Sequence, residues 1–243
     1  MRAYEGLAGS YDGLMEDAAY RRRASYLLRR LRRFGAEHVL DLGCGTGTIA
    51  CLLAAQGLRV TAADVSAEML ARAVQKAEGL ENPPLFIQQS MPKLRLAEPV
   101  DAVVSTIDAL NYLTSSRDLS ETLRRVRKWL KPGGPFLFDV NTPAKFRRMD
   151  RQVWMDETGD SFCVWRTFFS ERSGICTYQV DLFRLRPDGA WERSFEEHRE
   201  RAWERETLED TLKTAGFTEI SVYSDLTSRP PEPDDDRWQF LAV

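Results

Sequence analysis

The chain has 243 residues and a net charge of −3, and its 43% hydrophobic and 29% charged residues are typical of a globular protein. This length fits one large domain or one domain with an elaboration, and the charge excludes a global basic field that would hold nucleic acid. No apolar run reaches the roughly 20 residues of a membrane span, and the first residues lack the apolar core of a signal peptide. We therefore expect a cytoplasmic protein with no membrane partner and no nucleic acid.

The first predicted helix covers residues 20–35, and arginines crowd it. Leucines and Phe34 supply an apolar stripe, which favours a surface helix with a solvated arginine face over a patch for RNA or phosphate. The arginines are Arg21, Arg22, Arg23, Arg29, Arg30, Arg32 and Arg33.

Strands and helices then alternate along the chain. Predicted strands occupy 36–43, 58–64, 83–90, 99–108 and 135–141, with helices at 46–57, 67–79 and 117–130 between them. This alternation predicts an α/β fold, a doubly wound, Rossmann-like and mostly parallel sheet of seven strands. The last two strands, 218–226 and 237–243, follow a helix at 206–217 and are joined by a loop, so we expect the final strand to be antiparallel.

After Pro143 the pattern changes to long β-rich runs at 160–171, 174–186 and 190–203, separated by the turn signals RSG and PDG. We expect a small antiparallel β-insertion that forms a cap after the fifth strand. Its aromatic residues are expected to fill its own core rather than to stack on a substrate: Trp154, Trp165, Phe168, Phe169 and Trp191. The predicted domains are a helical lid (1–36), a Rossmann-like domain (37–150 and 203–243) and the cap (151–202).

The four cysteines lack Cys-x-x-Cys spacing, and only two histidines could join them as ligands. We therefore expect no metal site and no disulfide framework. The cysteines are Cys44, Cys51, Cys163 and Cys176.

The segment DLGCGTG, residues 41–47, forms the turn between the first strand and its helix. Glycines there permit a left-handed bend and let a ligand touch the backbone. The spacing Gly-x-Gly-x-Gly is one residue shorter than the nicotinamide pattern. Asp41 before the glycines suits an ammonium group better than a pyrophosphate, and Asp64 at the end of the second strand suits ribose hydroxyls.

This segment resembles motif I of the class I S-adenosylmethionine-dependent methyltransferases, and the family pattern can be followed from about residue 38 to the C-terminus. The resemblance implies S-adenosylmethionine as the cofactor. Ser90 stands where the family usually has the Asp of Gly-Asp-Met, so its role in holding adenine differs from that pattern. The implied cofactor-binding residues are Tyr11, Asp41, Gly43, Cys44, Gly45, Gly47, Asp64, Val65, Met69, Ser90 and Met91.

The N-terminal segment GSYDGLMED is similar to small-molecule members whose tyrosine folds over the methionine moiety, and Tyr11 is the matching residue; a packing tyrosine is the alternative. Lid and cap together look most like the glycine, sarcosine and amino-sugar N-methyltransferases. The segment Asn82–Leu85 copies the Asn-Pro-Pro-Tyr signature of nucleic-acid amino-methyltransferases, but it precedes the third predicted strand instead of following the fourth. We interpret it as a turn.

A sulfonium methyl is already activated, so catalysis is chiefly a matter of positioning the acceptor, and a base is optional. We expect a small-molecule acceptor with nitrogen or oxygen as the nucleophile; the alternatives are an RNA or protein acceptor, or a non-catalytic module that only binds the cofactor. A monomer or a homodimer fits equally. The candidate catalytic residues are Asp108, Asn111 and His198, and the candidate substrate residues are Tyr112, Asp139, Asn141 and Arg201.

Overall fold

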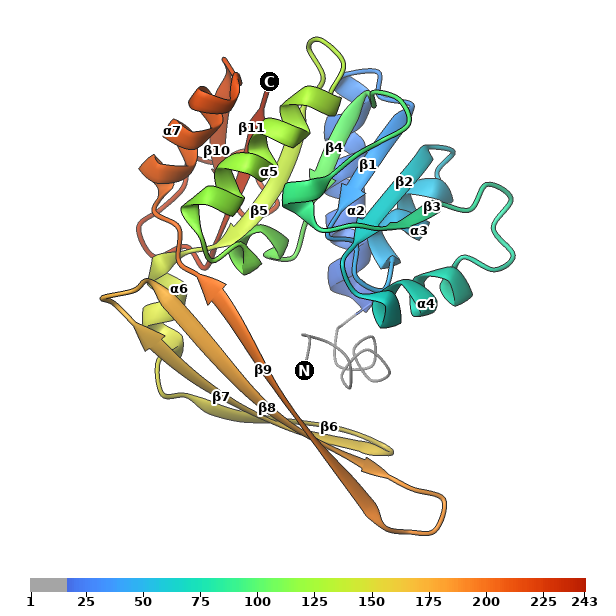
Figure 1. Cartoon of the computed structure of the whole chain (residues 1–243), viewed down its shortest axis with the longest axis vertical. Coiled ribbons are helices and arrows are strands. Elements are labelled where there is room, and N and C mark those ends of the chain that lie inside the picture. The colour runs from blue at the N-terminus through green and yellow to red at the C-terminus, as the bar shows by residue number, and fades with distance from the viewer. Residues whose placement is uncertain (1–16) are drawn as a thin grey trace.

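The computed structural model describes residues 17–243 and has a seven-stranded sheet at its centre, in the order β10-β11-β5-β4-β1-β2-β3 (Figure 1). Strands β1 to β5 run parallel, and β11 pairs antiparallel with both β5 and β10. The predicted mostly parallel sheet with an antiparallel last strand is confirmed. The strands are β1 (His38–Leu42), β2 (Arg59–Asp64), β3 (Leu85–Gln88), β4 (Ala102–Ser105), β5 (Phe136–Asn141), β10 (Ile220–Ser224) and β11 (Arg237–Ala242).

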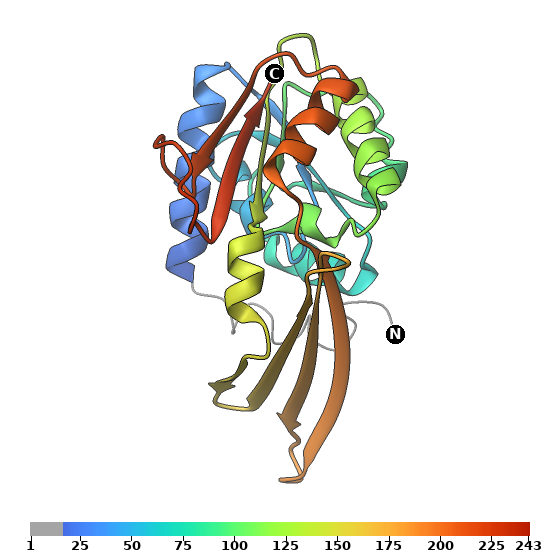
Figure 2. The same cartoon turned by 90° about the vertical axis from the view of Figure 1, so that its left-hand side faces the viewer.

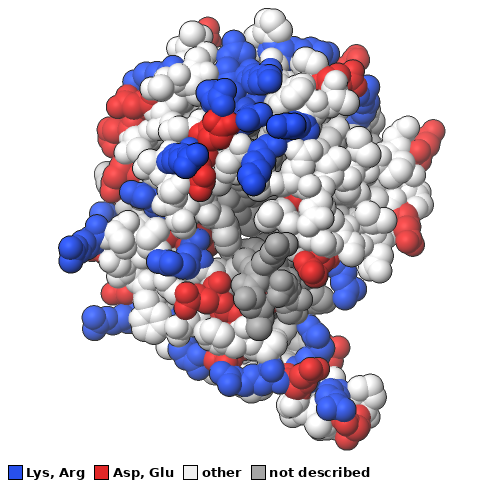
Figure 3. All heavy atoms as spheres, viewed as in Figure 1, with Lys and Arg blue, Asp and Glu red and all other residues white. Residues whose placement is uncertain are grey.

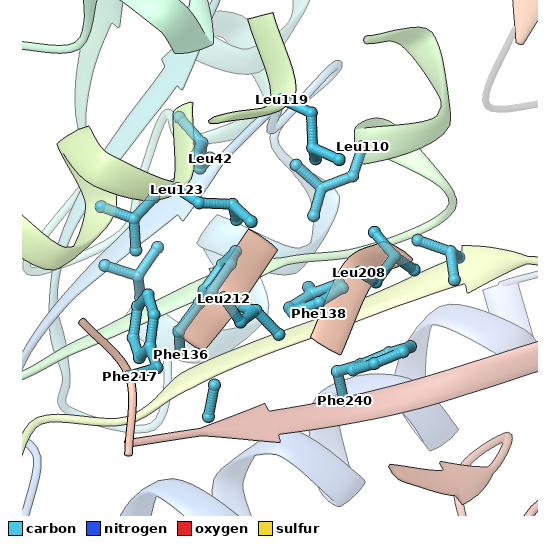
Figure 4. Packing of buried hydrophobic residues seen from close by; sticks show 14 of the residues in the cluster. Leu42, Leu110, Leu119, Leu123, Phe136, Phe138, Leu208, Leu212, Phe217 and Phe240 are labelled. Atoms are coloured by element: carbon cyan, nitrogen blue, oxygen red, sulfur yellow. The ribbon is translucent and has the colours of Figure 1, made fainter. Parts of the chain in front are cut away.

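Helices cover both faces of this sheet (Figure 2). On one face α5 and α7 pack over a core that includes the stacked rings of Phe136, Phe138 and Phe240 (Figure 4). On the other face α2 and α3 cover a second cluster of apolar residues. The helices of the main domain are α2 (Asp17–Arg33), α3 (Thr48–Ala54), α4 (Ala67–Lys76), α5 (Ser116–Trp129) and α7 (Arg205–Ala215), with 3-10 helices η2 (Met91–Lys93) and η3 (Ala109–Tyr112).

A separate four-stranded antiparallel sheet projects from the end of the main sheet at which the parallel strands terminate (Figures 1 and 2). Its strands are β6 (Val153–Thr158), β7 (Ser161–Ser170), β8 (Ile175–Leu185) and β9 (Trp191–Arg201), and we call it the cap sheet. The sequence predicts three of these strands but not β6 as a strand of its own.

A helix that the sequence analysis did not predict, α6 (Pro143–Met149), joins β5 to the cap sheet. Thr142 is its N-cap, because its hydroxyl accepts a hydrogen bond of 3.0 Å from the Lys145 backbone N–H. Pro143 occupies the first turn, where its missing N–H costs nothing. The proline that we interpreted as the end of the helix-strand pattern therefore begins a helix.

Two expectations about exposure are wrong. Arg23 and Arg30 of α2 are only 9% and 8% exposed, so the arginine face is not fully solvated. Both arginines bind residues of the C-terminal part of the chain, since Arg23 pairs with Asp225 and Arg30 donates to the Thr227 carbonyl.

The second wrong expectation about exposure concerns the aromatic residues of the cap sheet. Phe168 and Trp191 are 47% and 52% exposed, whereas Trp154, Trp165 and Phe169 pack against its buried residues as expected. Alternation along β7 and β9 places the two exposed rings on the outer face.

No helix within residues 17–243 is long and apolar enough to cross a membrane.

Candidate active site

A cavity of about 500 Å³ lies where β1, β2 and β4 end and the glycine turn begins. In a doubly wound sheet this edge is where ligands bind, because the loops leave a crevice there. The wall comes from the segment after β1, the start of α4, the segment after β3 and the segment after β4. Nine predicted cofactor residues line it: Asp41, Gly43, Cys44, Gly45, Asp64, Val65, Met69, Ser90 and Met91.

The glycine turn has the conformation that its sequence predicts. Gly43, Gly45 and Gly47 have φ angles of 77°, 53° and 72°, in the left-handed region that favours glycine. A Cβ on Gly43 would lie 2.6 Å from the Met91 methyl and 2.8 Å from the Ala109 Cβ, whereas a Cβ on Gly45 would meet nothing within 4 Å. Gly47 lies behind the turn, where a Cβ would overlap Ala73. The turn is therefore tightly packed at Gly43 and Gly47 and open at Gly45.

Asp64 ends β2, the strand paired with β1, and lies beside the glycine turn. One carboxylate oxygen accepts the Gly45 backbone N–H at 2.8 Å and the other accepts the Ser66 backbone N–H at 2.9 Å. Burial raises the pKa of Asp64, and these backbone donors offset part of that effect. Each oxygen keeps a lone pair that a hydroxyl of a ligand can use.

Asp41 is 1% exposed on β1 and lines the cavity floor. Neither of its oxygens has a hydrogen-bond partner of normal geometry among residues 17–243. Burial, together with the charge of Asp64, raises the pKa of Asp41 to about 7, and the Ala50 amide offsets only a small part of this. A buried carboxyl with no cation beside it among residues 17–243 favours a ligand that brings one.

The adenine end of the cavity, as the resemblance places it, is formed by the segment after β3. Ser90 caps η2 and Met91 follows it, and both line the cavity. Gln89, which is not among the predicted cofactor residues, also lines the cavity. Its amide is held by the Arg95 backbone, with distances of 2.7 and 2.9 Å, so it can stiffen this wall. Tyr11 lies outside the described residues.

The comparisons decide the family. A family model described as a methyltransferase domain matches residues 39–134. A methyltransferase-family protein of Geobacillus sp. (strain WCH70) is 32% identical over 243 residues, which covers 98% of each chain. The chain is an S-adenosylmethionine-dependent methyltransferase.

Solved structures agree on the fold of this methyltransferase. The crystal structure of an S-adenosylmethionine-dependent methyltransferase from Clostridium acetobutylicum superimposes with a TM-score of 0.87 at 24% identity, covering 99% of this chain and 98% of that one. A sugar N-methyltransferase, KedS8 from Streptoalloteichus, gives a TM-score of 0.81 at 20% identity and covers 100% and 94%. A glycine/sarcosine N-methyltransferase of Halorhodospira halochloris is 23% identical over 248 residues, 95% of this chain and 85% of its own. The predicted resemblance to this branch is confirmed.

The cavity of the methyltransferase fits its cofactor. S-adenosylmethionine carries an ammonium, ribose hydroxyls and a sulfonium whose methyl group is electrophilic. Asp64 offers acceptors for hydroxyls, Asp41 offers a buried carboxyl for a cation, and the left-handed glycines leave backbone exposed at the cavity wall.

The candidate residues on the acceptor side fall into two groups. Tyr112 lines the cavity, and its ring lies edge-on to that of His198 of β9, with 6.2 Å between ring centroids. His198 is 2% exposed, and its Nε2 lies 3.1 Å from a Glu196 carboxylate oxygen. These residues connect the cap sheet to the cavity wall.

The other candidates bind the protein itself and do not line the cavity. The Asn111 side chain donates to the carbonyls of Asn141 (3.1 Å) and Arg201 (2.9 Å) and accepts the Asn141 backbone N–H, so it joins β5 to β9. The Arg201 guanidinium donates to the Thr114 carbonyl at 3.0 Å and lies over the Trp203 ring. Their roles in catalysis or acceptor binding stay predictions.

Glu200 is a buried carboxyl at this junction that the sequence analysis missed. It is 3% exposed on β9 and accepts a hydrogen bond of 3.1 Å from the Asn141 side chain. Burial, with the nearby charge of Asp108, raises its pKa well above the usual range. The alternation of buried Glu196, His198 and Glu200 along β9 is the signal that could have found it.

Replacing Gly43 with alanine is expected to lower the melting temperature more than replacing Gly45. Both substitutions place a side chain at a positive φ, which costs about 1–2 kcal/mol. Only the Gly43 variant also overlaps Met91 and Ala109, which adds roughly 1–3 kcal/mol of overpacking. Thermal unfolding of both variants checks this, and equal losses would contradict the tight packing on the Gly43 side.

Proposed function

We propose that this methyltransferase transfers its methyl group to a nitrogen or oxygen atom of a small molecule by in-line displacement. The contact of β9 with η3 carries the proposal. Tyr112 lines the cavity while its ring meets His198, so β9 of the cap sheet lies against the cavity wall that follows β4. A polymer needs an open cleft on that side. A sugar N-methyltransferase and a glycine/sarcosine N-methyltransferase among the similar proteins support a small acceptor.

In the proposed reaction the acceptor's lone pair forms a bond to the methyl carbon as the carbon–sulfur bond breaks, and an acceptor proton leaves. The chain's own contribution is to position the acceptor and to take that proton. His198 is our candidate for the proton, because Glu196 lies 3.1 Å from its Nε2 and can orient the ring. His198 does not line the cavity, so the proton would reach it through Tyr112, which lines the cavity, contacts the His198 ring and would contact the acceptor.

Methylation of RNA or protein is the second candidate, because five arginines of α2 remain exposed: Arg21, Arg22, Arg29, Arg32 and Arg33. Basic and acidic side chains are interspersed on the face seen in Figure 3, which α5 and α7 cover, so that face does not favour a polyanion. The arginines of α2 lie on the opposite side of the sheet (Figure 2).

Methyl-labelled S-adenosylmethionine offered with pooled small amines and alcohols, with total RNA and with a protein extract separates these candidates. We expect label in the small-molecule fraction and none above background in RNA or protein. The Glu68→Ala variant, which keeps Asp64, serves as the active control and Asp64→Ala as the inactive one. Label in RNA that is lost when Arg29, Arg32 and Arg33 are replaced together would overturn the proposal in favour of the second candidate.

A further inference from the structure

We propose that Asp139 of β5 is a positioning residue for the cofactor, because its carboxylate clamps the backbone of Ile107 and Asp108 and thereby sets the cavity wall formed by residues 106–113. Asp139 is 0% exposed and does not line the cavity, so it acts through this backbone rather than by touching a ligand. The inference concerns the cofactor cavity and does not depend on which acceptor is used.

The clamped segment has an unfavourable backbone conformation. Ile107 and Asp108 have φ angles of 57° and 52°, in the left-handed region. A β-branched side chain is disfavoured there, because its Cβ approaches the backbone carbonyl, and isoleucine has none of the local hydrogen bonding that lets Asp or Asn adopt it. Such a conformation persists only where its surroundings enforce it, and it is common near functional sites.

The carboxylate of Asp139 holds this backbone conformation, and each of its two oxygens accepts one backbone N–H and one guanidinium N–H. One oxygen accepts the Ile107 backbone N–H at 3.0 Å and a guanidinium N–H of Arg23 at 2.9 Å. The other oxygen accepts the Asp108 backbone N–H at 2.9 Å and a guanidinium N–H of Arg237. Because two consecutive backbone donors bind one fixed carboxylate, the backbone between them is held in the observed bend.

Two arginines keep this buried carboxylate charged. Burial alone would raise the pKa of Asp139, but Arg23 and Arg237, with the two backbone donors, hold it below its usual value. Arg23 comes from α2 and Arg237 from β11, so the clamp joins the first described helix, β5, the last strand and the segment after β4. The Asp108 carboxylate itself pairs with Arg237 at 2.6 Å, which closes the network.

The wall that follows the clamp meets both ends of the site. Thr106, Ile107, Ala109, Tyr112 and Leu113 line the cavity. A Cβ on Gly43 would overlap Ala109, which shows how closely this wall approaches the glycine turn. Tyr112 contacts His198 on the cap sheet. A relaxed Ile107–Asp108 bend would therefore shift the wall against the cofactor and against the acceptor side together.

The first test replaces Asp139 with asparagine and measures S-adenosylhomocysteine binding by calorimetry. An amide presents one acceptor oxygen and one NH₂ group, which repels a backbone N–H, so one arm of the clamp is lost. We expect binding about tenfold weaker, because the competent wall is populated only part of the time. Asp225→Asn is the matched control: Asp225 also pairs with Arg23, at 3.1 Å, but binds no backbone N–H of residues 106–113, and its affinity should stay unchanged.

The decisive test compares Ile107→Gly with Ile107→Ala in the Asp139→Asn background. Both remove the same side chain beyond Cβ, but only glycine accepts a φ of 57° without strain. If Asp139 positions the backbone, the glycine variant should bind about fivefold or more tighter than the alanine variant. With Asp139 intact, the clamp holds either residue and the two affinities should agree within twofold.

If Asp139 only neutralised the buried arginines, the binding affinities of the Ile107 variants would differ from those expected above. Glycine and alanine would then bind S-adenosylhomocysteine equally in the Asp139→Asn background, and that result would overturn the proposal. Should Asp139→Asn not fold, the same two Ile107 variants are compared in the Arg23→Met background, because loss of this cation makes Asp139 easier to protonate and so weakens its hold on the two backbone N–H groups. The same glycine advantage is expected there at smaller size, and its absence would also count against the clamp.

Discussion

Replacing Asp64 with alanine is expected to weaken S-adenosylhomocysteine binding by roughly 100- to 1,000-fold. Hydrogen bonds to a charged group contribute about 1.5–3 kcal/mol each, and a ribose diol can make two with this carboxylate. The carboxylate also holds the glycine turn, since it accepts the Gly45 backbone N–H at 2.8 Å. Both effects act on cofactor binding in the same direction. Isothermal calorimetry measures the loss, and the melting-temperature rise that the ligand produces in the parent protein should disappear.

Glu68→Ala is the matched control, because Glu68 also lines the cavity but sits in the first turn of α4 rather than at the end of β2. Among residues 17–243 its carboxylate accepts a hydrogen bond from the Ser66 hydroxyl alone, at 3.1 Å, so we expect an affinity within about threefold of the parent protein. The affinity of Asp64→Asn should lie between those of the parent protein and of Asp64→Ala, because the amide keeps one acceptor oxygen. An Asp64→Ala variant that binds as tightly as Glu68→Ala would refute the assignment to ribose.

The cofactor cavity could be predicted from sequence because its determinants are local. Gly43, Gly45 and Gly47 lie on one strand-to-helix turn, and Asp64 ends the next strand, so parallel pairing of β1 with β2 brings them together. The alternation of strands and helices fixes that pairing without any knowledge of side-chain contacts. Tyr11, which was also predicted to bind the cofactor, lies outside the described residues.

The clamp could not be predicted, because its members are far apart in the chain. Arg23 and Asp139 are separated by 116 positions, and Arg237 and Asp139 by 98. The sequence of α2 does not show which of its arginines are buried and which are solvated. Arg23 differs from its exposed neighbours only in the residues that it contacts in the folded protein. Asp139 was predicted to contact substrate from its place at the end of β5; the hydrogen bonds it makes give it a different role in our proposal.

The pH dependence of cofactor binding is expected to follow Asp41. The pKa of Asp41 is raised to about 7 without ligand, so the group is mostly protonated at pH 6 and mostly ionised at pH 8. We propose that the ionised form pairs with the ammonium of the cofactor. Affinity for S-adenosylhomocysteine should then rise about tenfold from pH 6 to pH 8, because the ionised fraction of a group with a pKa of about 7 rises about tenfold over this range. Calorimetry across this range measures it, and Asp41→Asn should bind weakly with no such slope.

Stability of the ligand-free protein should change in the opposite direction over a lower pH window. The folded pKa of Asp41, about 7, lies above the usual value of 3.8, so the folded protein binds a proton that the unfolded chain has released. The free energy of unfolding should therefore fall as pH rises from about 4 to about 7, by up to about 1.4 kcal/mol for each pKa unit, and level off above that. Asn cannot ionise, so Asp41→Asn should unfold at a higher temperature than the parent at pH 8 while binding its ligand less tightly. If Asp41→Asn instead loses both stability and affinity at pH 8, the ionised Asp41 carboxylate stabilises the fold itself, and the proposed role in pairing with the ligand's cation is wrong. We expect the Asp41→Asn variant to gain stability and to lose affinity. Both results follow if the buried negative charge of Asp41 is unfavourable until the ammonium of the ligand pairs with it.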